Sequence, residues 1–365
     1  MNKGIIVVKV GTSTLSRSSG RVDPAYISSL TGQISVLMRG GYKVILVTSG
    51  AIGAGIEALG LPARPKDIGS LQACAAIGQG RIMKHYQQSF KRRGIHAAQI
   101  LLTRDDFADR KRFLNAKNTM FTLMYRMGAV PVINENDTIA TEEIKFGDND
   151  RLSAMVASLV SASTLVLLTD VDGLYSPEDK KVIPIVAKIS AEIERMVRPA
   201  KGKWGVGGMA SKLAAARIAM RGGTTCIIAN GGAPRILLKI AGNEPVGTTF
   251  MAAKVRQKAK KSWLAFAPKP RGVIIVDAGA RDAIEERKTS LLAAGIRGAK
   301  GYFLPGDVVD IAGPGGVPFA RGMAAYSSVD IGRIKGRKSA EVARMFGRER
   351  VCDEVVHRDN MVLLR

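Results

Sequence analysis

Lysine, serine, asparagine, aspartate and glycine residues directly follow five short apolar segments of this 365-residue chain. The apolar segments are 5–8, 44–47, 130–133, 165–168 and 226–229, and the polar segments are 9–13, 48–51, 134–137, 169–173 and 230–232. Uninterrupted apolar runs of this length predict strands buried on both faces, as in a parallel sheet covered by helices. Ligands of such sheets bind outside the carboxyl ends of the strands. The polar segments therefore predict one ligand site at one edge of the sheet.

A glycine-rich loop adds a second indication of anion binding. The segment 205–212, Gly-Val-Gly-Gly-Met-Ala-Ser-Lys, leads into an apolar segment with helical character, predicted as a helix over 211–221. Backbone N–H groups at the start of a helix attract anions, and Lys212 would add a full positive charge. The loop lacks the Gly-Lys-Ser/Thr ending of a Walker A motif. A flexible surface loop is the alternative interpretation.

Two carboxylates and one amide lie within three residues at Asp148, Asn149 and Asp150, before an apolar helical stretch at 154–160. A helix N-cap explains one of these residues well. The alternative is that the carboxylates hold lysines, a substrate ammonium group or Mg²⁺. Lys9 follows four apolar residues at the predicted ligand edge, although a surface lysine would fit the same pattern.

Other motifs are weaker. Gly53-Ala54-Gly55 follows a strand and fits a loose dinucleotide fingerprint, but the segment 72–74, where the next strand should end, looks helical. The dispersed histidines His85, His96 and His357 offer no catalyst.

The net charge of +24 invites a nucleic-acid interpretation. The excess is spread along the chain and is sharpest at 250–271, which has seven basic side chains and no acidic one, whereas 272–365 has 15 against 12. We therefore favour a solvated basic surface over an RNA-binding face. A field of this sign would also attract anionic substrates.

The chain is long enough for one large domain and a smaller one, and 46% of its residues are hydrophobic. Isolated cysteines argue against a zinc site and a disulfide framework. No apolar stretch of about 18 residues predicts a membrane span, and no signal-peptide pattern is present, so a cytoplasmic protein is expected.

Strand and helix patterns alternate up to residue 250, including a helix predicted over 23–39. A catalytic domain is therefore predicted over 1–250. A basic linker follows over 251–271, then a small β-rich domain over 272–350 and a C-terminal tail over 351–365.

The ordered set of motifs resembles the amino acid kinase family. The segments that carry the resemblance are 9–13, 47–52, 134–137, 147–150, 169–170 and 207–212. The family fold is a three-layer α/β sandwich with a mostly parallel central sheet, and residues 272–350 resemble a β-rich PUA domain. The NEND and GDND motifs and the PUA-like region resemble the branch that phosphorylates the side-chain carboxylate of L-glutamate with ATP, at the start of proline biosynthesis. Branches that act on acetylglutamate, aspartate, carbamate or uridylate are the alternatives.

The resemblance also implies a role for individual residues. Catalysis would involve Lys9, Lys212, Asp148 and Asp150, with the aspartates orienting the lysines. The acceptor would be held by Ser49, Gly50, Asn134, Asp137 and Asn149. ATP, which brings Mg²⁺, would contact Lys9, Gly11, Thr169, Asp170, Val206, Gly207, Gly208, Met209, Ala210, Ser211 and Lys212. The family often has threonine where Val206 stands, so one side-chain contact to the nucleotide is in doubt. No separate protein metal site is expected.

Partners are also implied by the resemblance. They are a second copy of the chain, in a dimer or tetramer, and glutamyl phosphate reductase, which would receive the product. RNA binding through the PUA-like domain is a weaker alternative. Only one basic cluster there, at 333–338, supports it, and a solvated loop is the favoured interpretation of that cluster. An RNA-binding module with a degenerate kinase fold is the rival interpretation, and the retained Lys9, Asp150 and Lys212 argue against it.

Overall fold

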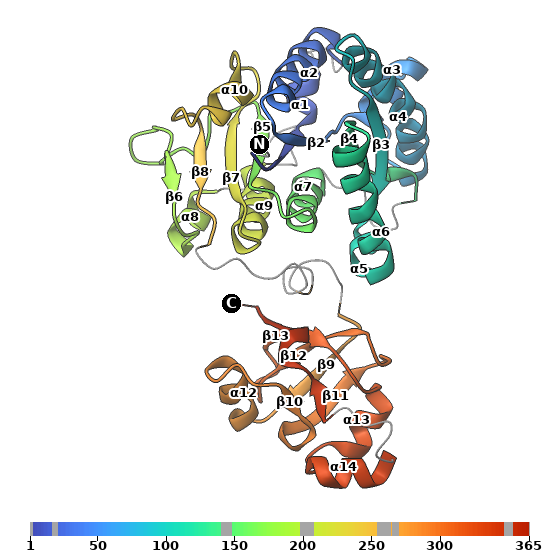
Figure 1. Ribbon diagram of the computed structural model, residues 1–365, viewed down its shortest axis with the longest axis vertical. Coiled ribbons are helices and arrows are strands. Elements are labelled where there is room, and N and C mark those ends of the chain that lie inside the picture. Colours follow the sequence, from blue (N-terminus) through green and yellow to red (C-terminus); the bar gives the residue numbers. More distant parts are fainter. Residues whose placement is uncertain are drawn as a thin grey trace. The chain divides into compact units, whose positions relative to one another are not determined.

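The computed structural model describes residues 3–16, 21–139, 148–197, 208–253, 264, 270–346 and 353–364, without the side chains of Ala108 and Asp148. The chain divides into two compact units, an N-terminal one that holds most of residues 1–256 and a C-terminal one that holds residues 257–365 (Figure 1). Each unit has its own hydrophobic core, and each is described by itself.

The N-terminal unit is built on one eight-stranded sheet. Its strands, in spatial order, are β3 (Ala97–Leu102), β4 (Val130–Glu135), β2 (Lys43–Val47), β1 (Ile5–Val10), β5 (Thr164–Thr169), β7 (Thr225–Asn230), β8 (Thr248–Phe250) and β6 (Ile185–Val186). All neighbours are parallel except β7 and β8. The five strands predicted from the sequence are β4, β2, β1, β5 and β7. They are contiguous and parallel, so the predicted fold class is confirmed.

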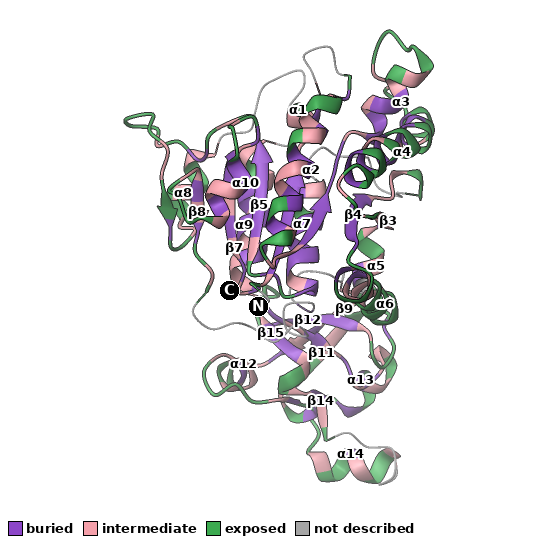
Figure 2. Cartoon of the chain, turned by 45° about the horizontal axis from the view of Figure 1, so that its top comes forward, coloured by how far each residue is buried: buried purple, intermediate pink, exposed green. Residues whose placement is uncertain are grey.

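Helices cover both faces of this sheet. The longer ones are α2 (Pro24–Arg39), α3 (Ala51–Leu59), α4 (Ile68–Lys91), α6 (Arg110–Phe121), α7 (Asp148–Leu159) and α9 (Met209–Arg221). The shorter ones are α1 (Thr12–Leu15), α5 (Arg104–Ala108), η1 (Thr122–Arg126), η2 (Asp137–Ile139), α8 (Ala191–Met196) and α10 (Ile236–Ala241). On one face, α2, α4 and α10 share a core with Val8 and Val10 of β1. Helix α7 packs against β1 and β5, and α9 packs against α7. The strands between the helices are largely buried (Figure 2).

Helix α2 ends as predicted, and its N-cap Asp23 accepts a hydrogen bond from the Ala25 backbone at 3.0 Å. Two other helices start earlier than the sequence predicts. Helix α9 begins at Met209, and α7 begins at Asp148, six residues before the apolar stretch. Asp and Asn are poor helix formers in the interior, but the positive end of the helix dipole favours carboxylates in the first turn. This placement brings Asp150 into the first turn of α7.

The glycines of α3 and α4 allow the two helices to pack closely. A Cβ atom at Gly55 would lie 1.9 Å from the carbonyl oxygen of Cys74, and one at Gly78 would lie 1.8 Å from that of Ala51. Only glycine fits at such distances. The glycine at position 55 is therefore explained by helix packing, without a dinucleotide.

The C-terminal unit is β-rich. Its five-stranded sheet has the order β11 (Ile296–Gly301), β9 (Gly272–Val276), β12 (Val308–Ala312), β13 (Pro318–Met323) and β15 (Met361–Leu363), and β10 (Leu291–Leu292) pairs with β14 (Glu354–Val356). Its helices are α12 (Ala278–Glu285), α13 (Ser328–Ile334) and α14 (Ser339–Phe346), with single 3₁₀ turns η3 (Ala293–Gly295) and η5 (Arg358–Asn360).

The prediction of a C-terminal tail over 351–365 is wrong for the residues that the structure describes there. Strand β15 is the edge strand of the five-stranded sheet and pairs with β13, and β14 closes the smaller sheet. Val355, Val356, Met361 and Val362 are buried. Three-residue strands are too short to show a clear alternation in sequence, which explains the error. Among the described residues, no helix has the length and apolar character needed to cross a membrane.

Candidate active site

Lys9 owes its position to the alternation of side chains along β1. Val8 and Val10 belong to the core shared with α2 and α10, so Lys9 points to the opposite face of the sheet, where α7 lies. Strand β1 also lies between β2 and β5, at the point where the strand order of the parallel sheet changes direction. This is the position at which open α/β sheets bind their ligands.

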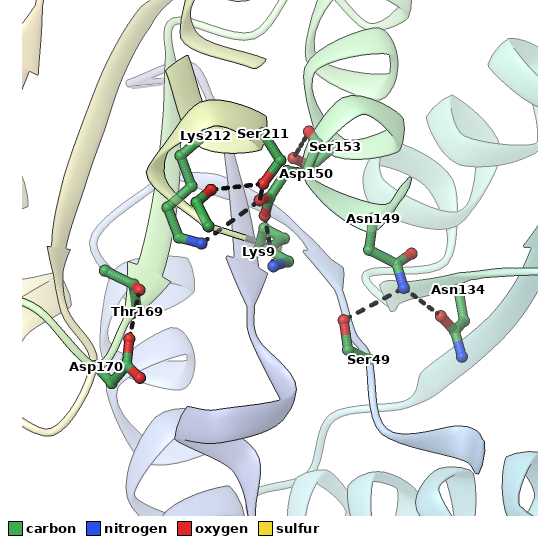
Figure 3. Close-up of polar contacts among 11 residues, drawn as sticks. Lys9, Ser49, Asn134, Asn149, Asp150, Ser153, Thr169, Asp170, Ser211 and Lys212 are labelled. Atoms are coloured by element: carbon green, nitrogen blue, oxygen red, sulfur yellow. Dashed lines mark hydrogen bonds and ion pairs between the residues drawn. The ribbon is translucent and has the colours of Figure 1, made fainter. Parts of the chain in front are cut away.

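Lys9 and Lys212 meet at a single carboxylate, that of Asp150 (Figure 3). The Lys9 Nζ atom lies 2.5 Å from Asp150 Oδ1, and the Lys212 Nζ atom lies 3.6 Å from Asp150 Oδ2. Ser211 donates a hydrogen bond of 2.6 Å to the same Oδ2. All three charged side chains are buried. Elements that are far apart in the sequence thus place the two ammonium groups on either side of one carboxylate.

The burial of this cluster shifts the pKa values of its members. Burial alone would raise the pKa of Asp150, but Lys9, Lys212 and the hydrogen bond from Ser211 outweigh it and hold that pKa below its usual value. Burial lowers the pKa of Lys212, helped by Lys9 and opposed by the charges of Asp150 and Asp170. Asp150 is therefore a fixed anion at neutral pH.

A second group of polar side chains lies beside this cluster (Figure 3). Asn149, in the first turn of α7, donates from Nδ2 to Ser49 Oγ at 3.2 Å and to Asn134 Oδ1 at 3.0 Å. Ser49 follows β2, and Asn134 is near the end of β4. Gly50 adopts a positive φ of 94° at the start of α3, which favours glycine. The ends of two neighbouring strands and one helix thus form an amide-rich subsite.

Thr169, Asp170 and the start of α9, which are among the described residues expected to contact ATP, lie on the other side of Lys9 from the amide-rich subsite (Figure 3). Thr169 donates a 3.0 Å hydrogen bond to Asp170 at the end of β5. Gly208 caps the N-terminus of α9, whose first turn carries Ser211 and Lys212. A Cβ atom at Gly11 would lie 3.7 Å from Lys9 Nζ, so glycine leaves space in front of that amine. Backbone N–H groups, one helix N-terminus and two lysines suit a phosphate chain.

Some predicted site residues are not placed with these groups. Val206, Gly207 and the side chain of Asp148 lie outside the described residues. Asp137 begins η2, two residues after the end of β4. Burial lowers the pKa of Arg64, and the negative charge of Asp137 opposes that shift.

Comparison with known proteins decides the family. Residues 4–230 match the model of the amino acid kinase family. The chain belongs to the amino acid kinase family. Residues 272–346 match the PUA domain, so both resemblances are confirmed.

Relatives of this amino acid kinase share nearly its whole length. The proteins named glutamate 5-kinase from Geobacter sp. (strain M21) and Trichlorobacter lovleyi are 44% and 46% identical over 98% of this chain, covering 97% and 96% of their own lengths. The protein of that name from Gloeobacter violaceus is 44% identical, over 98% of this chain and 99% of its own.

One residue of the amide-rich subsite, Gln79, was not predicted from the sequence. Gln79 of α4 accepts a 2.8 Å hydrogen bond from Asn134 Nδ2. No strand precedes Gln79, so the rule that points to strand ends cannot find it. The available signal was a lone polar amide in the small-residue segment 74–80.

Proposed function

We propose that this enzyme transfers the γ-phosphoryl group of ATP to the side-chain carboxylate of L-glutamate, giving L-glutamyl 5-phosphate in the first step of proline biosynthesis. The observation that carries the proposal is the buried pairing of Lys9 and Lys212 with Asp150, at the ligand edge of an amino acid kinase sheet. Relatives named glutamate 5-kinase over nearly the full length support the choice of acceptor.

The chemistry requires charge and position rather than a base. A glutamate side chain has an unperturbed pKa of about 4.3, so it is already ionised at neutral pH. The developing metaphosphate-like charge is stabilised by cations that are fixed before the reaction. Lys9 and Lys212 supply them, and Asp150 prevents the two ammonium groups from moving apart. Two anionic reactants can thus approach one another in line.

The nucleotide side of the site also fits this reaction. The first turn of α9 and the two lysines offer donors to the β- and γ-phosphates, and Gly11 leaves space beside Lys9. Mg²⁺ is commonly held by substrate phosphates with one or two carboxylates, and among the described side chains no three His, Cys, Asp or Glu residues converge as a cage. A metal ion of this kind would arrive with ATP and neutralise its phosphates.

A substrate panel tests the proposal. ADP release is measured with L-glutamate, L-aspartate, N-acetylglutamate, carbamate and uridylate at saturating ATP and Mg²⁺. We expect kcat/KM to be highest for L-glutamate. A higher value for any of the other four acceptors would overturn the proposed acceptor.

Substitution of Asp137 tests how the acceptor is held. Asp137→Ala is expected to raise KM for glutamate far more than KM for ATP, because we assign its carboxylate to the ammonium group of the amino acid. Initial rates with each substrate varied in turn give both constants. Equal increases in the two constants would contradict the assignment.

The lowered pKa of Lys212 predicts a pH dependence. Lys212 must be protonated to act on phosphates, and its pKa in the free enzyme lies below the ordinary lysine value of about 10.4. The ratio kcat/KM for ATP reports the free enzyme. We therefore expect it to fall at a lower alkaline pH than the titration of a lysine with an ordinary pKa would cause. In Lys212→Arg the fall should move to higher pH, because a guanidinium keeps its proton. An identical pH profile in this variant would exclude Lys212 as the titrating group.

Truncation tests the division of labour between the two units. Every site residue proposed above lies between positions 9 and 212, so a chain of residues 1–261 should fold and retain glutamate-dependent ADP release within about an order of magnitude. Some loss of solubility is expected if apolar surface becomes exposed. A soluble, folded truncation with no activity at saturating substrates would place a catalytic contribution in the PUA domain.

A further inference from the structure

Gln79 is joined to the acceptor subsite by a chain of amide hydrogen bonds. Its Oε1 atom accepts from Asn134 Nδ2 at 2.8 Å. Asn134 Oδ1 in turn accepts from Asn149 Nδ2 at 3.0 Å and from the backbone N–H of Glu135 at 2.9 Å. The chain links α4, β4 and α7, and Asn134 at its centre is buried.

This chain fixes the orientation of all three amides. The backbone N–H of Glu135 can only donate, so Asn134 must direct its oxygen to that side and its NH₂ group to Gln79. Asn149 then has to donate toward Asn134 and Ser49. Each terminal amide is left with one atom outside the chain, the Nε2 donor of Gln79 and the Oδ1 acceptor of Asn149.

Those two atoms are buried, and neither has a hydrogen-bond partner in the part of the chain that the structure describes. A buried polar atom without a partner is costly, so a ligand that supplies both partners would be stabilised here. One atom is a donor and the other an acceptor. An α-amino acid carries the matching groups, a carboxylate that accepts and an ammonium group that donates.

We propose that Gln79 recognises the α-carboxylate of the amino-acid acceptor through its Nε2 group, while Asn149 Oδ1 accepts from the α-ammonium group. The inference rests on the proposed function and extends it to a specificity-determining residue on α4. Asn134 lies between the amides of Gln79 and Asn149 and fixes their separation and relative orientation. The site would thereby select acceptors that have both α groups in addition to the carboxylate that is phosphorylated.

Two analogues of glutamate test this assignment. Glutarate lacks the ammonium group, and 4-aminobutyrate lacks the α-carboxylate. Wild-type enzyme is first shown to phosphorylate glutamate, and failure at this step would refute the proposed function rather than the role of Gln79. The KM for glutamate and the competitive inhibition constants of both analogues are then measured in wild type, Gln79→Met and Gln79→Glu.

For Gln79→Met we expect the KM for glutamate and the inhibition constant of glutarate to rise about tenfold or more, as for a lost hydrogen bond to a charged group. The inhibition constant of 4-aminobutyrate and the KM for ATP should change less than about threefold, since neither ligand uses that contact. Gln79→Glu keeps the oxygen that faces Asn134 but should bind glutamate no better than Gln79→Met, because it places two carboxylates together.

The matched control is Gln88→Met, an exposed glutamine of the same helix, which should leave all constants unchanged. Thermal melts establish that each variant is folded. Equal losses for glutamate, glutarate and 4-aminobutyrate would show that Gln79 only supports the subsite and would overturn the proposal. Near-normal glutamate binding by Gln79→Glu would overturn it as well, because the Nε2 donor is then dispensable.

Discussion

Alanine at Lys9 or at Lys212 is expected to lower kcat by about 10²-fold or more, with smaller effects on KM for either substrate. Both ammonium groups are buried against Asp150, so they act in a site with little water, where a fixed charge has its largest effect. Their interaction with the phosphoryl group is strongest in the transition state, which is why the loss should appear in kcat.

The matched control for both variants is Lys181→Ala, because Lys181 is exposed and its ammonium group lies 3.8 Å from Asp179 rather than from a site residue. Lys181→Ala should keep wild-type kinetics. Thermal melts separate a folding defect from a catalytic one, since alanine at Lys9 leaves the carboxylate of Asp150 less well paired. A folded variant with a near-normal kcat would remove that lysine from the mechanism.

The second large effect is expected at Asp150. Asp150→Asn should also lower kcat by about 10²-fold or more, because the two lysines lose the anion that holds them side by side. Asparagine has nearly the same shape as aspartate and leaves no cavity, so the fall in kcat would be caused by the lost charge and the changed orientation of the lysines. Asp179→Asn on the exposed surface is the control and should be without effect.

The same substitution should change stability in a way that depends on pH. The pKa of Asp150 is lowered in the folded protein, so its ionised form contributes stability above the unfolded value of about 3.9. That contribution is lost as pH falls through the folded pKa. We expect the Tm of wild type to exceed that of Asp150→Asn at pH 7, and the difference to shrink in strongly acidic solution. A difference independent of pH would contradict the charged state assigned to Asp150.

The main parts of the fold could be predicted from the sequence because short apolar segments are a strong local signal of buried strands. Short apolar runs bounded by turn residues, such as 165–168, indicate buried strands, and parallel strands bring their carboxyl ends to one edge. That rule places Lys9, Ser49 and Asn134 near each other without any knowledge of the structure. The pairing of Lys9 and Lys212 with Asp150 needed more, because three distant elements must pack in one particular way.

Other features have no clear signal in the sequence. Gln79 lies in the middle of α4, so no strand end marks it in the sequence. The strands β14 and β15 are three residues long and are stabilised by pairing with distant strands rather than by their own pattern. The earlier start of α7 reflects helix-end electrostatics, which a count of apolar residues does not include.

The most direct measurement of the central claim is the trapping of the acyl phosphate. The full chain is incubated with ATP, Mg²⁺ and L-glutamate in the presence of hydroxylamine, which converts a glutamyl phosphate into the stable hydroxamate. We expect γ-glutamyl hydroxamate in amounts equal to the ADP released, and little of either with Lys212→Ala. ADP release without hydroxamate, or hydroxamate formed with another acceptor but not with glutamate, would contradict the central claim.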